Sequence, residues 1–287
     1  MRDMLTTLGG RWVVRDEEWC DGLTGARVNV ADPLAGVDRS EPLPSAFLTG
    51  GPTEELQLVV SWSMRIWTDE RTQLGHSVET FLAGLDLGAP MGWGLGEPVT
   101  RPWSMAAVTE FARSRMPQPT CLVVVGAGAR AVLTMTVQRT SHGVEEMCTG
   151  LVGLGGVDDP AAARRLAAVP QVLAAMCEGT MPLFGLVLAR SGPSDLTCWP
   201  RLPGPPMPVA MLIGPPGVIE LGVDVLAEAD RWGAVVAGRK KFPALVYPLV
   251  ASDGADPSRL SAILAGFDRD KLRAVFARSA VQLPAED

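Results

Sequence analysis

Histidine and paired cysteines are scarce in this sequence, and both shortages restrict its metal chemistry. His76 and His142 are the only histidines among 287 residues, so a metal site would need most of its ligands from carboxylates. The five cysteines are widely spaced, and none forms a CxxC pair of the kind that binds zinc or carries redox chemistry. The sequence therefore predicts reduced thiols and no metal ion or other cofactor.

Long apolar runs are also missing. A helix needs about 20 consecutive apolar residues to cross a bilayer, whereas the apolar strings at Leu183–Ala189 and Val209–Ile213 have the length of strands. The N-terminal stretch MRDMLTTLGGRWVVRDEEW lacks the continuous apolar segment of a signal peptide. We therefore expect a cytoplasmic protein with no membrane insertion.

Positive charge is sparse as well. The formal net charge is −7, and the only dense basic group is Arg239–Lys241. Binding to a nucleic-acid backbone needs clustered Lys and Arg that displace counterions. We therefore expect no nucleic-acid partner and interpret the basic triplet as a solvated turn.

What the sequence does contain is a run of strand-like segments between Thr120 and Gly156. Cys121–Val125 is an unbroken apolar stretch, Ala131–Arg139 alternates apolar and polar residues, and Val144–Leu154 is again rich in strand-forming residues. Glycine-bearing turns separate the three segments. This pattern predicts a central antiparallel β-meander over residues 120–156.

Strand-like and helix-like segments alternate on both sides of the meander. The pattern predicts an α+β fold with two α/β lobes around a mixed sheet. We expect the first lobe over residues 56–156 and the second over residues 157–287, with residues 1–55 as an N-terminal strap or arm. Proline-rich stretches that resist regular strand pairing lie at residues 31–52 and 191–208.

The first helix of the fold is predicted to begin at Thr68. Thr68 suits an N-cap, and Asp69 and Glu70 would follow in the first turn, where the helix dipole favours negative charge. His76 points away from the apolar stripe of this helix. We therefore interpret His76 as a surface residue.

Two glycine-rich stretches imitate nucleotide-binding loops without their chemistry. Val123–Ala131 fits G-x-G-x-x-A after a strand, but the β-rich segment that follows predicts a strand where a dinucleotide site needs a helix. Ile213–Asp224 opens a helix after a strand, but Val223 and Asp224 stand where a phosphate loop needs Lys and Ser or Thr. We interpret Gly126–Gly128 as a turn between strands.

The sequence Ser141-His142-Gly143 most simply forms a hairpin turn with a positive φ angle at Gly143. With His142–Gly143 as a two-residue loop, Arg139 is predicted to lie opposite Glu146. The same register places Cys148 on the apolar face, where the thiol would be buried and inert.

Catalytic signatures are absent, and no G-x-S-x-G nucleophile turn occurs. The only polar cluster that suggests an alternative site consists of Arg139, His142, Glu145 and Glu146. We interpret the Glu145–Glu146 doublet as a partly exposed strand face rather than an acid/base pair. The sequence therefore assigns no catalytic, cofactor-binding or metal-binding residue.

Four strings of this sequence resemble the actinobacterial domain-of-unknown-function family 6177. They are GWGLGEPVTRPW (Gly92–Trp103), RMPQPTCLVVVGAGARAVLT (Arg115–Thr134), VQRTSHGVEE (Val137–Glu146) and PALVYPL (Pro243–Leu249). The resemblance spans roughly residues 56–250 and rests on glycine-tryptophan turns and strand edges. It implies a gene in or near a type VII secretion locus, and it carries no activity or catalytic residue.

The leading functional hypothesis is a non-enzymatic cytosolic binding or adaptor protein, acting as a chaperone or accessory factor of type VII secretion. Trp93, Trp103 and Trp199 are the candidate contacts to a protein partner, because tryptophan often anchors interfaces. One alternative is an enzyme or small-molecule sensor with a site near the loop 213–218. Another is a structural subunit of a larger assembly.

Overall fold

A computed structural model describes residues 13–15, 19–21, 25–29, 31, 54–69, 72–196, 206–251, 254–255 and 257–279. Most of the predicted strap and parts of both proline-rich stretches therefore lie outside the described residues. Within the strap, strand β1 (Val13–Arg15) pairs antiparallel with β2 (Trp19–Asp21).

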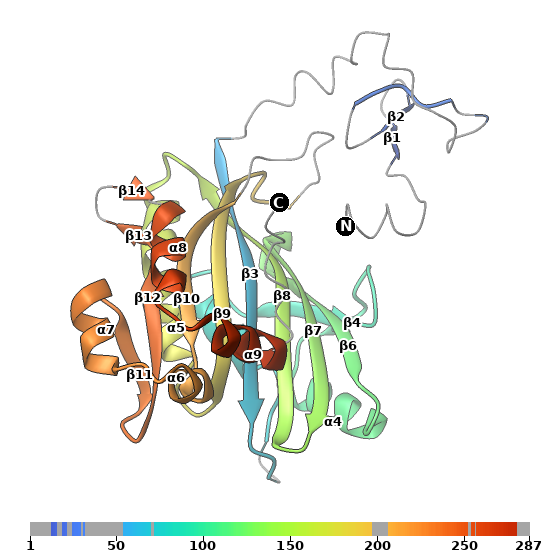
Figure 1. Ribbon diagram of the computed structural model, residues 1–287. Coiled ribbons are helices and arrows are strands. Elements are labelled where there is room, and N and C mark those ends of the chain that lie inside the picture. The colour runs from blue at the N-terminus through green and yellow to red at the C-terminus, as the bar shows by residue number, and fades with distance from the viewer. Residues whose placement is uncertain are drawn as a thin grey trace.

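One ten-stranded sheet organises the rest of the described chain (Figure 1). Its strands lie in the order β11 (Val235–Arg239), β12 (Phe242–Pro248), β10 (Met207–Ile213), β9 (Met181–Ser191), β3 (Glu55–Ile66), β8 (Gly143–Gly156), β7 (Ala131–Thr140), β6 (Thr120–Gly126), β4 (Pro90–Gly94) and β5 (Arg101–Pro102). With the helices described below, this sheet confirms the predicted α+β class.

The expectation of a mixed sheet is wrong, because every neighbouring pair in the ten-stranded sheet is antiparallel. Strands β8 and β9 are joined through a helix, a connection that in sequence suggests a parallel pair. They do run in the same direction, but β3 lies between them and is antiparallel to both. Strand β3 belongs to the predicted first lobe and β9 to the predicted second lobe, so strands from both predicted lobes pair in one sheet. The division into two lobes stays a prediction.

The meander over residues 120–156 is confirmed as β6, β7 and β8. A short 3-10 turn over Ala127–Ala129 joins β6 to β7, so the dinucleotide-like loop is indeed a turn between strands. Gly143 has the expected positive φ of 125°. The predicted hairpin register is wrong by two residues, because Thr140 pairs with Gly143 and Ser141–His142 forms the loop.

Helices α3 (His76–Gly84), α4 (Met105–Arg115) and α5 (Pro160–Ala175) pack on one face of the sheet. Trp62 of β3 packs against Phe81 of α3 in this core, with ring centroids 4.8 Å apart. The predicted helix start at Thr68 is wrong, since α3 begins at His76 and Thr68 lies before it in an irregular segment. His76 is exposed, as predicted.

On the opposite face of the sheet, described helices form a second core over β9, β10 and β12. Helices α6 (Pro215–Leu221), α8 (Pro257–Ala265) and α9 (Arg269–Ser279) form a second core there with Phe184, Met211 and Tyr247. Helix α7 (Val225–Trp232) contacts β12 and β11, and the short pair β13 (Val250–Ala251) and β14 (Gly254–Ala255) lies against β10. None of the described helices is long and apolar enough to cross a membrane.

Candidate functional site

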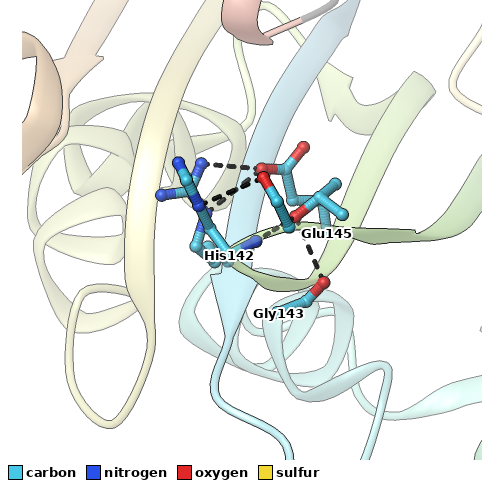
Figure 2. A network of polar contacts seen from close by, with 6 residues as sticks. His142, Gly143 and Glu145 are labelled. Atoms are coloured by element: carbon cyan, nitrogen blue, oxygen red, sulfur yellow. Dashed lines mark hydrogen bonds and ion pairs between the residues drawn. The ribbon is translucent and has the colours of Figure 1, made fainter.

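The two glutamates of the suggested polar site point to opposite faces of the sheet, because neighbouring residues on a strand alternate. Glu145 faces the same side as Arg65 of β3, its cross-strand neighbour. The Nε and Nη2 groups of Arg65 donate to Glu145 Oε1 at 3.1 and 2.8 Å (Figure 2). Both side chains are largely buried, so Glu145 serves a closed ion pair rather than an open acid/base site.

Glu146 faces the other side and caps the N-terminus of α3. Its Oε2 accepts the backbone N–H of Gly75 at 2.6 Å, and its Oε1 accepts the hydroxyl of Ser77. Ser77 Oγ in turn accepts the indole N–H of Trp62 at 2.9 Å. The helix dipole and both donors favour the carboxylate at this position.

The predicted exposure of the Glu145–Glu146 doublet is therefore wrong, since both residues are buried. Burial raises the pKa of Glu146, while the hydrogen bonds from Ser77 and Gly75 oppose that rise. Cys148 is buried as predicted, and burial followed by the nearby Glu146 raises the pKa of its thiol, which keeps it unreactive.

Arg139 and His142 do not join these glutamates. Arg139 lies opposite Val144 rather than Glu146, and its side chain is exposed. His142 is exposed in the hairpin loop, where its Nδ1 lies 3.2 Å from Ser141 Oγ (Figure 2). The four residues therefore form no common site.

Metal-ligand geometry does not assemble elsewhere in the part of the chain that the structure describes. No group of three or more His, Cys, Asp or Glu residues in that part is placed to hold an ion.

The candidate tryptophans have different environments. Trp93 is only 2% exposed and packs against Phe111 beneath Arg101, so it belongs to the core and is not an accessible contact. Trp103 is half-buried, and its indole N–H donates to Glu79 Oε1 at 2.6 Å. Trp199 lies outside the described residues.

The loop 213–218, proposed for the alternative enzyme or sensor, is closely packed. Gly214 precedes α6, and a Cβ atom at this position would lie 1.8 Å from the carbonyl oxygen of Pro182. Ile213, Gly217 and Val218 are buried as well, and none of the loop residues is ionisable. The loop offers packing rather than a binding chemistry.

The remaining surface feature is the part of the second face that lies over β3, β8, β7 and β6. The helices of the second core lie over β9, β10 and β12 instead, and the residues of this surface are half-buried or exposed. We call this surface the open half-face. It consists of Val59, Ser61, Cys121, Val123, Val125, Val132, Thr134, Thr136, Met147, Thr149 and Leu151.

The open half-face is neutral in a protein of net charge −7. Its members are aliphatic, hydroxyl or sulfur-bearing side chains, and none is charged. Thr134, Thr149 and Cys121 are exposed, and the other members are half-buried. The Arg65–Glu145 pair marks its border near the β7–β8 hairpin.

Sequence reasoning found the strands of this surface but not its exposure. The alternation in Ala131–Arg139 identifies two faces of β7, and the apolar one is buried. A signal for the open side was available in the small polar residues Thr134, Thr136 and Thr149, which antiparallel sheets typically turn toward solvent.

Comparisons with known proteins give a family but no activity. No curated protein matches the chain. Among solved structures, the Pseudomonas aeruginosa T6SS protein PA0821 is similar at 10% identity and a TM-score of 0.39, over 71% of each chain, a likeness too distant to support a functional argument. The model of the DUF6177 C-terminal domain matches residues 57–269, which include the ten-stranded sheet except for the start of β3 at Glu55 and Leu56. The chain therefore belongs to the DUF6177 family.

Proposed function

We propose that this chain is a non-enzymatic cytosolic protein-binding protein, an adaptor whose partner docks on the open half-face. The observation that carries the proposal is the chemistry of this surface. Its aliphatic and hydroxyl side chains, among them Val123, Thr134 and Thr149, are neutral and lie partly in solvent. A contiguous uncharged surface of this kind is typical of sites where another protein binds.

The neighbouring half of the same face indicates the kind of partner. Over β9, β10 and β12 the chain covers the sheet with its own helices α6, α8 and α9. The open half-face spans four strands, and three strand spacings of about 4.8 Å give a width of about 14 Å. A single helix with its side chains is about 10 Å across. The partner segment is therefore an amphipathic helix that continues the layer formed by α9.

Neutrality also defines which face of the partner helix would bind. A charged side chain placed over Val123 or Val125 would lose water without gaining an ion pair. A helix face made of aliphatic and small hydroxyl residues would instead match Thr134 and Thr149. The Arg65–Glu145 pair neutralises itself at the border and leaves no charge to attract or repel the helix.

The role in type VII secretion, as a chaperone or accessory factor, comes from the family resemblance. An amphipathic helix is a suitable cargo for such a factor, because its apolar stripe promotes aggregation unless it is kept covered in the cytosol. The secretion role and the docking surface are separate parts of the proposal and are tested separately.

Site-specific photo-crosslinking in source cells tests the docking surface. A photoreactive phenylalanine analogue replaces Thr134 in the full chain, and a matched control carries it at Ala163, an exposed residue of α5. We expect Thr134 to crosslink a distinct protein through one amphipathic helical segment. Adding Thr149→Arg to the same chain is expected to abolish the crosslink.

Three results would contradict the docking surface: no crosslink from position 134, the same crosslinks from both positions, or no loss with Thr149→Arg. The identity of the crosslinked protein then tests the secretion role. A secreted substrate or a component of a secretion machine supports it, and a partner unrelated to secretion overturns that part alone.

A further inference from the structure

The edge of the sheet formed by β11 differs in character from the open half-face. In the part of the chain that the structure describes, strand β11 is the last in the strand order and pairs only with β12. Residues on an antiparallel strand alternate between those whose backbone groups face the neighbour and those whose groups face away. Every second residue of β11 therefore turns its N–H and C=O groups outward, where another strand can pair.

This edge carries the basic triplet that the sequence singled out. Arg239 ends β11, and Lys240 and Lys241 form the two-residue loop to β12. All three are exposed, and none takes part in an ion pair among the described residues. They hold three of the 25 Lys and Arg residues of an acidic chain within one turn.

Lysine at a sheet edge can also serve to repel unwanted strand pairing. Two exposed apolar side chains at this end of the sheet argue for binding instead. Val236 of β11 is 46% exposed and Phe242 of β12 is 55% exposed, so the edge keeps apolar contact area beside its cations. An edge strand whose lysines served only to prevent strand pairing would not need these exposed apolar side chains.

The acidic residues of α7 lie away from the basic turn. Helix α7 ends at Trp232, just before β11 begins, whereas the triplet follows the other end of the strand (Figure 1). A strand of five residues separates them by roughly 13 Å at about 3.3 Å per residue. In addition, Glu228 of α7 accepts a hydrogen bond from the hydroxyl of Tyr247 at 2.9 Å.

We propose that β11 is a docking site for an extended acidic peptide segment of a partner protein, which adds to the sheet as an eleventh strand. Backbone pairing with β11 supplies affinity for any extended segment. Arg239, Lys240 and Lys241 select for negative charge at the end that passes the turn. Val236 of β11 contacts the side chains of the added strand that lie on its own face of the sheet. This site is separate from the open half-face and does not depend on its function.

Peptide binding to the full chain tests the site. The probe is a fluorescein-labelled peptide, Glu-Val-Glu-Val-Glu-Val, measured by fluorescence anisotropy. Control peptides replace Glu with Lys, or carry an N-methyl group on every residue so that neither edge can donate a backbone hydrogen bond. We expect the acidic peptide alone to bind, with an affinity that falls several-fold when salt is raised from about 50 to about 300 mM.

Matched charge variants locate the binding. Lys240→Glu with Lys241→Glu is expected to weaken binding at least about tenfold. Arg130→Glu with Arg164→Glu changes the net charge equally at exposed positions elsewhere and should leave the affinity within about twofold. Hydrogen exchange at the backbone of β11 should slow when the acidic peptide is bound.

Several outcomes would overturn the proposal. One is equal binding of the N-methylated or Lys-containing peptide, and another is an equal effect of both charge variants. A single-stranded oligonucleotide that binds better than the peptide would show a polyanion site instead. A stable dimer in light scattering that Val236→Lys dissociates would show that a second copy of the chain occupies the edge.

Discussion

The second face of the sheet has two halves. They share one continuous set of paired strands but differ in their side chains and in the helices that cover them. On one half, large apolar residues of β9, β10 and β12 such as Phe184, Met211 and Tyr247 are buried under α6 and α9. On the other half, the same cross-strand rows continue with Ser61, Thr149 and Thr134. The change from large apolar to small hydroxyl residues occurs at β3, where the helical layer of the described chain ends.

This difference shows that the side chains of each strand, and not the backbone pairing of the sheet, determine whether a helix covers that strand. Ser61, which is half-buried, and Leu186, which is buried, are direct cross-strand neighbours. A buried Phe or Leu contributes about 1.5–3 kcal/mol through the area it removes from water, which the chain gains by placing a helix over it. A Ser or Thr offers too little apolar area to order a helix from the same chain.

The largest expected effect comes from removing an apolar anchor of the covered half. Phe184 is 1% exposed within the second core, so Phe184→Ala should lower the free energy of unfolding by about 3–5 kcal/mol. Val125→Ala on the open half-face is the matched truncation and should cost about 1 kcal/mol or less, since Val125 is only half-buried. Urea denaturation measures both, and equal losses would remove the distinction between the halves.

The closed face of the same strands should be sensitive to the loss of the buried carboxylate of Glu146. Glu146→Ala leaves the N–H of Gly75 and the hydroxyl of Ser77 without their acceptor at the start of α3. Each unsatisfied buried donor costs about 1–3 kcal/mol, so we expect a loss of about 2–4 kcal/mol in urea denaturation. Glu146→Gln keeps a carbonyl acceptor and should lose less. A loss below that of the Gln variant would contradict the capping role.

The same residue should make stability depend on pH in a defined direction. Burial raises the folded-state pKa of Glu146 above its ordinary value of 4.5, so the folded chain holds this proton more tightly than the unfolded chain. Its stabilising contribution is therefore complete below pH 4.5 and is lost as pH rises from there through the raised pKa. The difference in unfolding free energy between wild type and Glu146→Gln should fall over that window. A difference that grows with pH would show that the hydrogen bonds to the carboxylate outweigh the effect of burial.

The border between the halves depends on the Arg65–Glu145 pair. Arg65→Met leaves Glu145 largely buried without a partner and should cost about 2–3 kcal/mol, somewhat below a fully buried pair because both side chains retain some exposure. Adding Glu145→Leu removes the uncompensated charge and should recover most of the loss. Thermal and urea unfolding of the single and double variants measure the interaction free energy between Arg65 and Glu145. An additive double variant would mean that the pair does not stabilise the border.

Much of the fold could be predicted from local patterns, and the failures share a cause. The meander, its glycine turns and the exposure of His76 follow from alternation and turn residues over short distances. The sheet was expected to be mixed, but β3 lies between β8 and β9, which a helix joins in sequence, and every pair is antiparallel. That insertion joins residues about a hundred positions apart, which no local pattern records.

The candidate site was harder to predict because it depends on what covers each residue. Trp93 resembles an interface anchor in sequence, yet it packs against Phe111 in the core. Glu146 resembles an exposed strand residue, but a helix that begins at His76 places Gly75 and Ser77 against it. Both errors arise from helices packed on the sheet, and the same lack of information concealed the open half-face.

The smallest expected effect is the one that most sharply separates the halves. Thr149→Arg places a long charged side chain on the open half-face, where Thr149 is already exposed, so the unfolding free energy should change by no more than about 0.5 kcal/mol. Met211→Arg places the same side chain beneath the helices of the covered half and should prevent stable folding, because a buried unpaired charge has no compensation there. Thermal unfolding of the two variants compares them directly. A large loss from Thr149→Arg would mean that this half is also closed by the chain itself, and the partner surface would have to lie elsewhere.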